Sequence, residues 1–208
     1  MFSQAQVAPG NLPFPRFTAA DGRVDTDGMP LSGASLCILP EKASCFTMPS
    51  RTQLPPSGVT YDFGLEPRAE RWPLASGGSW IFFSSMFSGG GSGTLTRVAM
   101  LRYEPDGKIA NLMPYIAATN VSDFAMWSVP AASRYPVFVE AEFVWGNGES
   151  HFGPHYYDVT AWTFDPRTDR YVKAFQYRTS KRYDSDADRI RVLKPEHDEI
   201  LRRLEKAH

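Results

Sequence analysis

The sequence predicts a mainly β protein in which an antiparallel meander forms a sandwich, a barrel or a propeller-like sheet. Aromatic residues make up 13% of the 208 residues, and aromatic and β-branched side chains favour the half-buried surface of a sheet. Short apolar runs also recur at regular spacing from residue 79, with residues typical of turns between them. We expect one domain over residues 1–208, made of an irregular Pro/Gly-rich segment (1–78), the meander (79–178) and a helical C-terminal segment (186–208).

The first segment, residues 1–78, holds ten of the 17 prolines and eight of the 16 glycines. Because proline cannot donate to a sheet ladder and both residue types interrupt helices, this segment favours turns and short edge strands. We expect such strands at 36–39, 45–48 and 59–63. Apolar side chains such as Trp72 indicate that the segment packs onto the rest of the chain.

In the meander, turn residues separate the apolar runs. The segments 104–107 and 166–169 carry proline and glycine or aspartate where hairpin turns favour them. Asn147-Gly148 is typical of a two-residue type I′ hairpin. The strands are expected to begin near Trp80, Thr94, Ile109, Ser122, Val137, Tyr156 and Tyr171.

The clearest strand pattern runs from Val137 to Trp145. Apolar side chains occupy every second position from Val137, while Glu140 and Glu142 fall on the other face. This alternation predicts one buried face and one face toward water. Two carboxylates roughly 7 Å apart also have the spacing of a glycosidase acid pair, although surface glutamates are the commoner arrangement.

Near Tyr171 both faces of the expected strand are partly apolar. In a regular strand Tyr171 and Tyr177 share one face, and Val172 and Ala174 lie on the other. Such a strand is typical of the centre of a sheet, covered here by the C-terminal helix. If the tyrosine face is instead exposed, it provides an aromatic strip for a partner.

One helix is predicted near the C-terminus, beginning around Pro195. Proline suits the first turn of a helix, and acidic residues follow it while basic residues come later, as the helix dipole favours. Ile200, Leu201 and Leu204 form an apolar stripe that would dock on the sheet.

The chain contains two cysteines, Cys37 and Cys45. Neither a C-x-x-C spacing nor a nearby histidine points to zinc, so a disulfide is the preferred prediction and two unrelated buried thiols the alternative. Disulfides persist in oxidising compartments, which favours a periplasmic or secreted protein. The residues after Met1 lack the apolar core of a signal peptide, so a cytoplasmic location stays open.

Charge and motifs argue against several partner classes. With 22 basic and 23 acidic side chains, the chain has no basic stripe for nucleic acid, and no apolar run approaches the roughly 18 residues of a membrane span. The Gly-rich run 88–94 lacks the lysine of a phosphate-binding loop, and the acidic run 21–28 lacks key ligands of a calcium loop. We therefore expect neither a cofactor nor a bound metal.

The most suggestive segment for function is 149–158. It places His151 and His155 close to Asp158, and imidazole with carboxylate serves both metal binding and general-base catalysis. Gly153-Pro154 predicts a loop, however, in which a spacing of four does not bring two histidines together. Contact with a ligand or partner is the next interpretation after plain loop residues.

Aromatic side chains concentrate in the same part of the chain, with 11 among the 41 residues from Phe143 to Tyr183. Tyrosine and tryptophan provide rigid amphipathic contact area. The candidate contact residues are Trp145, His151, His155, Tyr156, Tyr157, Asp158, Tyr171 and Tyr177.

Three function classes follow. The preferred one is a non-catalytic binding module of the cell envelope or secreted space, which recognises a protein or carbohydrate partner through an aromatic-rich sheet face. Inhibitor and immunity proteins belong to this class. The second is a hydrolase or metal-dependent enzyme with a site around His151, His155 and Asp158. The third is a structural or assembly subunit. No catalytic signature selects among them.

Overall fold

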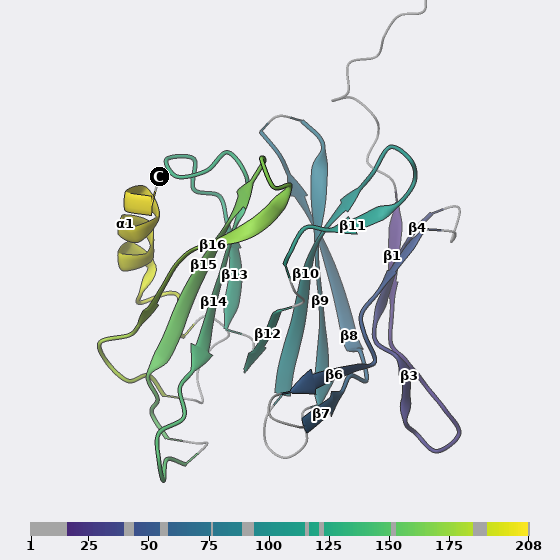
Figure 1. Ribbon diagram of the computed structural model, residues 1–208, viewed down its shortest axis with the longest axis horizontal. Helices are drawn as coiled ribbons and strands as arrows, with labels where there is room; N and C mark the ends of the chain where they lie inside the picture. Colours follow the sequence, from purple (N-terminus) through teal and green to yellow (C-terminus); the bar gives the residue numbers. More distant parts are fainter. Residues whose placement is uncertain are drawn as a thin grey trace, which may run out of the picture.

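The computed structural model is built mainly from β-strands (Figure 1). It describes residues 16–39, 44–54, 58–75, 77–88, 94–114, 117–120, 123–150, 153–184 and 191–207. The first seven strands are β1 (Phe17–Ala20), β2 (Arg23–Val24), β3 (Pro30–Ser32), β4 (Ser35–Ile38), β5 (Cys45–Thr47), β6 (Arg51–Leu54) and β7 (Gly58–Tyr61). The next five are β8 (Leu65–Pro73), β9 (Ser79–Ser88), β10 (Thr94–Tyr103), β11 (Ile109–Asn111) and β12 (Ala117–Asn120). The last elements are β13 (Phe124–Trp127), β14 (Val137–Phe143), β15 (Tyr157–Asp165), β16 (Arg170–Arg178) and α1 (His197–Ala207).

The elements stack in four layers, which Figure 1 shows edge on. An outer sheet of β1, β4 and β5 covers the first sandwich sheet, formed by β8 to β12. The second sandwich sheet, β13 to β16, packs on the other side of the first, and α1 covers its outer face. The prediction of a mainly β fold with a C-terminal helix is confirmed, and the sandwich is the arrangement observed.

The core between the two sandwich sheets is largely aromatic. Trp80 and Phe82 from β9 meet Phe138 from β14 and Trp162 from β15, and all four are buried. The rings of Trp80 and Tyr135 stack with centroids 5.3 Å apart. Aromatic rings bury large areas and gain further from such contacts, so this layer joins the sheets.

The other face of each sandwich sheet is also buried. Ile81 and Phe83 pack under the outer sheet against Leu36, while Val139 packs under α1 against Leu204. Alternate residues of one strand therefore enter different cores. A strand with two buried faces cannot show the simple apolar and polar alternation of a sheet that faces water.

The expectation that Glu140 faces water is wrong. It points into the core between the sheets, is only 3% exposed, and accepts a hydrogen bond of 2.9 Å from the indole Nε1 of Trp162. Glu142, two residues further along β14, is exposed. The two carboxylates therefore lie in different environments, one in the core and one exposed.

The prediction that the strand near Tyr171 is central is also wrong, because β16 is the edge strand of its sheet, next to β15, in the described part of the chain. A bulge at Ala161 and Trp162 shifts the register, so that Trp162 pairs with Lys173 and Ala161 with Phe175. A shift of one residue moves the following side chains to the opposite face. Tyr171 consequently lies between the sheets, whereas Tyr177 packs on the side of α1.

The turn residues predicted one hairpin correctly and another incorrectly. The 104–107 turn joins β10 to β11 as expected, with the Gly107 N–H donating to the Glu104 carbonyl at 2.9 Å. Asn147-Gly148 forms a turn, but β14 ends at Phe143 and β15 begins at Tyr157, so a long loop replaces the two-residue hairpin. In the described residues, no helix is long and apolar enough to cross a bilayer.

Contacts of the segment 62–64 tie the chain after β1 and the chain before β8 to the first sandwich sheet. The carboxylate of Asp62 accepts the Gly64 N–H at 2.7 Å and lies 2.6 Å from the Arg97 guanidinium of β10. The Gly64 carbonyl in turn accepts the Gly22 N–H at 3.0 Å. A Cβ atom on Gly22 would lie 2.4 Å from the Phe63 carbonyl oxygen, so only glycine fits there.

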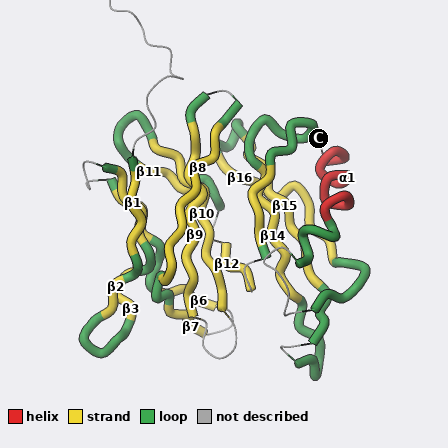
Figure 2. Tube along the Cα trace, turned by 180° about the vertical axis from the view of Figure 1, so that it is seen from behind, coloured by secondary structure: helices red, strands yellow, loops and turns green. Residues whose placement is uncertain are grey.

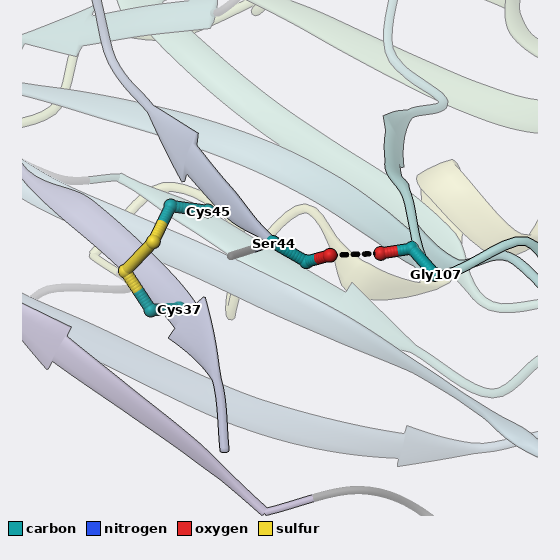
Figure 3. Close-up of a disulfide and its surroundings, with 4 residues drawn as sticks. All are labelled: Cys37, Ser44, Cys45 and Gly107. Carbon is teal, nitrogen blue, oxygen red and sulfur yellow. Dashed lines mark hydrogen bonds between the residues drawn. A yellow bond between two sulfur atoms is a disulfide. The ribbon is translucent and has the colours of Figure 1, made fainter. Parts of the chain in front are cut away.

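Cys37 and Cys45 form a disulfide, as predicted (Figure 3). The two residues lie directly opposite each other in β4 and β5. Next to this bond, the Ser44 hydroxyl donates to the Gly107 carbonyl and so links the hairpin to the β10–β11 turn. The disulfide therefore fastens the outermost layer and lies outside the core of the sandwich.

Replacing both cysteines with serine is expected to lower the free energy of unfolding by about 2.5 kcal/mol, because the bond closes a loop of nine residues in the unfolded chain. Denaturant unfolding of wild type and of the double variant Cys37→Ser/Cys45→Ser measures this. Wild type with reductant is the matched control and should lose the same amount. Unchanged stability in both samples would contradict an entropic contribution from the bond.

Candidate functional site

The structure buries part of the predicted aromatic strip. Tyr157 and Tyr171 are each only 1% exposed. The Tyr171 hydroxyl donates to the Pro136 carbonyl at 2.8 Å, and burial raises the pKa of this phenol. The Tyr157 hydroxyl accepts from Arg191 Nε at 3.1 Å, and burial likewise raises its pKa. Both side chains hold the core together and cannot reach a partner.

Two further predicted residues hold neighbouring elements in place. The Tyr177 hydroxyl donates to the Glu196 carboxylate at 2.8 Å, next to the start of α1. The Arg203 guanidinium lies 4.2 Å from the centre of the Tyr177 ring, so this tyrosine docks the helix. Asp158 accepts two hydrogen bonds from Arg178, at 2.9 and 3.1 Å. The single exposed strip expected from the sequence therefore does not form.

The remaining candidates lie in the loop between β14 and β15, residues 144–156. Trp145 is 57% exposed, the most of any tryptophan among the described residues. Its ring rests against Phe143, with centroids 4.7 Å apart, and against the edge of His155 at 5.9 Å. His151 lies outside the described residues. Trp145 is thus an indole that packs on Phe143 and His155 and is more than half exposed.

His155 is the buried support of this loop. Its side chain is 1% exposed, its Nδ1 lies 3.1 Å from the Glu149 carboxylate, and its Nε2 lies 3.0 Å from the Ser150 carbonyl. Its backbone exchanges hydrogen bonds of 2.8 and 2.9 Å with Tyr183, beyond the end of β16. Both ring nitrogens are engaged with oxygen acceptors, so the imidazole fixes the loop and offers no free nitrogen to a ligand.

Glu149 connects the parts of the loop. Its carboxylate accepts the Gly146 N–H at 2.9 Å and lies 2.7 Å from the Arg182 guanidinium. The Gly146 N–H, the His155 ring and Arg182 together hold the pKa of Glu149 below its ordinary value. A Cβ atom on Gly146 would lie 2.5 Å from this carboxyl carbon. The carboxylate therefore closes the turn that follows Trp145 tightly.

Tyr156 lies on the opposite side of the loop from Trp145. The Val144 N–H donates to the Tyr156 carbonyl at 2.8 Å, and side chains alternate from that pair. Trp145 and His155 accordingly share one side, while Tyr156 lies on the other, under the Arg182 guanidinium at 5.0 Å. Tyr156 is 37% exposed, so it is the second accessible aromatic side chain of the loop.

Sequence reasoning found Trp145, His155 and Tyr156 but missed the roles of Glu149 and Arg182. A glycine followed three residues later by a glutamate, Gly146 and Glu149, is the only local signal for this closure. Arg182 arrives from beyond the end of β16, and nothing near it in the sequence predicts the contact. Within the described residues, no three metal-ligating side chains gather at one point.

Comparison of the chain with known protein families, with curated proteins and with solved structures finds no match.

Proposed function

We propose that the protein is a non-catalytic binding module that contacts a protein or carbohydrate partner through the Trp145 side of the β14–β15 loop. The observation that carries the proposal is the exposure of the Trp145 indole on a loop whose support is buried and hydrogen-bonded. A rigid exposed tryptophan provides a large contact area at little cost in conformational entropy, which is why it recurs at the centre of interfaces.

The closed loop supports the same proposal. Binding is tighter when the contact surface is already ordered, because less entropy is lost on association. The Glu149 carboxylate, the His155 ring and Arg182 order the loop without using the Trp145 surface. The disulfide between Cys37 and Cys45 adds support for a periplasmic or secreted location.

Among the residues that the structure describes, no observation favours a hydrolase or a metal-dependent enzyme in the same way. A general base or a metal ligand needs a free ring nitrogen that faces a space for substrate. Both nitrogens of His155 are engaged in the loop, and Asp158 binds Arg178. We therefore do not propose the hydrolase.

The test compares the binding of Trp145→Ala and of wild type to two sets of ligands. One set is a glycan array and the other is a crude extract of envelope proteins. We expect Trp145→Ala to weaken the specific ligand by at least about tenfold, the loss typical of a central tryptophan. The glycan arm and the protein arm distinguish the two partner classes. Far-ultraviolet circular dichroism and thermal unfolding should be unchanged, because the indole is exposed.

Two further variants sharpen the result. Tyr61→Ala, at an aromatic side chain that is 40% exposed elsewhere, is the matched control and should bind like wild type. Glu149→Gln keeps Trp145 but weakens the closure of the loop, so we expect an intermediate loss. The proposal is overturned if Trp145→Ala retains every ligand that wild type retains.

A further inference from the structure

The imidazole of His155 is buried between two oxygen atoms. It belongs to the loop of residues 144–156, which Figures 1 and 2 show extending beyond the end of the second sandwich sheet. Its Nδ1 lies 3.1 Å from a carboxylate oxygen of Glu149, and its Nε2 lies 3.0 Å from the Ser150 carbonyl oxygen. The side chain is only 1% exposed, so the ring depends on these two oxygens for its hydrogen bonds.

Neither oxygen can donate a hydrogen bond to the ring. The Gly146 N–H, together with the other neighbours of Glu149, holds the pKa of this carboxyl below its ordinary value, so the group is an ionised acceptor. The Ser150 carbonyl is also an acceptor, and a hydrogen bond of 3.1 Å from the Gly153 N–H fixes it in a turn. A neutral imidazole has one N–H group and one lone pair, whereas an imidazolium has two N–H groups. Only the imidazolium can donate to both oxygens.

Loss of one of these protons works against the closed loop, in which the Gly146 N–H is bonded to Glu149. The neutral ring would turn a lone pair toward one of the two oxygens. A buried acceptor that faces another acceptor lacks its hydrogen bond, which costs free energy in an environment away from water. If the loop opens, water can donate to the lone pair. The neutral ring therefore favours the open loop, and the imidazolium favours the closed one.

Among the described residues, Glu149 is the only carboxylate that forms an ion pair with His155. The Arg182 guanidinium lies 2.7 Å from the same carboxylate and opposes a positive charge on the ring, as does burial. The Phe143 and Trp145 rings, which pack on the imidazole from the β14 side, do not titrate. The other titratable neighbours are Lys181 over the Tyr183 ring, Tyr183 bonded to Glu196, Tyr157 bonded to Arg191, and the exposed Asp184. The charge on the ring therefore depends on Glu149.

We propose that His155 is an imidazolium in the closed loop, and that a rise in pH removes one of its protons and loosens the loop that carries Trp145. Because the closed loop holds both protons against acceptors, closure is favoured at low pH and is lost as the pH rises. This clamp follows from the geometry of the loop alone. Only its effect on binding, a weaker contact through the Trp145 side at high pH, rests on the proposed function.

Nuclear magnetic resonance of the isotope-labelled wild-type protein tests both parts of the proposal. The shifts of the two ring nitrogens distinguish the imidazolium from each neutral tautomer, and we expect two N–H groups on His155 at about pH 5 and one at about pH 8. Over the same range, the protection of the Gly146 N–H from hydrogen exchange, relative to an unstructured amide at the same pH, should fall at least about fivefold. The Gly107 N–H, which donates to the Glu104 carbonyl in the β10–β11 turn, is the matched control and should keep its protection.

Two variants show whether the Glu149 carboxylate is the cause. The amide of Glu149→Gln can donate to a neutral ring, so its Gly146 protection should change by less than about twofold between the two pH values. Asp158→Asn, at a carboxylate bonded to Arg178, should keep the wild-type dependence on pH. The proposal is refuted by a single ring N–H at about pH 5, by an imidazolium that persists at about pH 8, by Gly146 protection that does not follow the ring, or by an unchanged dependence in Glu149→Gln. No ligand is used, so such a failure leaves the proposed function standing.

Discussion

Replacing Asp62 with alanine is expected to lower the free energy of unfolding by about 3–5 kcal/mol, the loss typical of breaking a buried ion pair from one side. The Asp62 and Arg97 side chains are 0% and 4% exposed, and their charged groups lie 2.6 Å apart. Burial raises the pKa of Asp62 against the opposing influence of Arg97, and burial lowers the pKa of Arg97. Removing the carboxylate takes this counter-charge from a buried guanidinium. Denaturant unfolding measures the loss.

Two controls show whether burial is the cause. The exposed pair of Asp106 and Lys108 has the same separation of 2.6 Å, so Asp106→Ala should change stability far less. The double variant Asp62→Ala/Arg97→Met removes both charges and should regain most of the loss, because an apolar pair of similar volume often replaces a buried ion pair without cost. Equal losses for Asp62→Ala and Asp106→Ala would contradict this explanation.

Gly64→Ala is expected to lower the free energy of unfolding by at least about 4 kcal/mol, a size that single substitutions reach only through a steric or packing fault. Gly64 has a φ of 60°, and a Cβ atom there would lie 2.2 Å from the backbone nitrogen of Ala34. Because the atoms that this Cβ would meet all belong to the backbone, no side-chain rotation relieves the clash. The outer sheet must shift away from the sandwich. Urea unfolding measures the loss, and the yield of folded protein is a second readout.

Gly78 is the matched control for this substitution. Its φ is 80°, yet nothing lies within 4 Å of the position that a Cβ atom would take. Gly78→Ala should therefore cost only the roughly 1–2 kcal/mol of a left-handed backbone. A Gly64→Ala protein that is as stable as Gly78→Ala would show that the outer sheet and β8 are not packed this closely.

Much of the fold could be predicted because its signals are local. The alternation in β14, the turn at 104–107 and the stripe of α1 each depend on neighbouring residues only. Whether a given face of a strand is exposed to solvent is not determined by neighbouring residues alone. Glu140 looked exposed because a glutamate usually faces water, and its burial depends on Trp162, which is 22 positions away. Covering layers on both sides of a sheet leave no mark on the alternation of one strand.

The prediction of an exposed aromatic strip failed for a related reason. A bulge adds one residue to one strand, and it has no residue signature at Ala161 and Trp162. Tyr171 and Tyr177 share a face in every regular strand, so only the structure could separate them. The candidate loop was better predicted, because Trp145 and His155 belong to one short segment. The contacts that close this loop were not predicted, since Arg182 comes from a distant part of the chain.

The cover that α1 gives the second sandwich sheet also constrains the order in which the protein is made. Val139 and Ala161 pack under residues 191–207 and are fully buried there, and these residues leave the ribosome after β1 to β16. Until then a nascent chain displays an apolar sheet face, the kind of surface that drives aggregation and recruits chaperones. A stalled or truncated chain that ends before residue 191 would be a substrate for quality control, even with β1 to β16 complete.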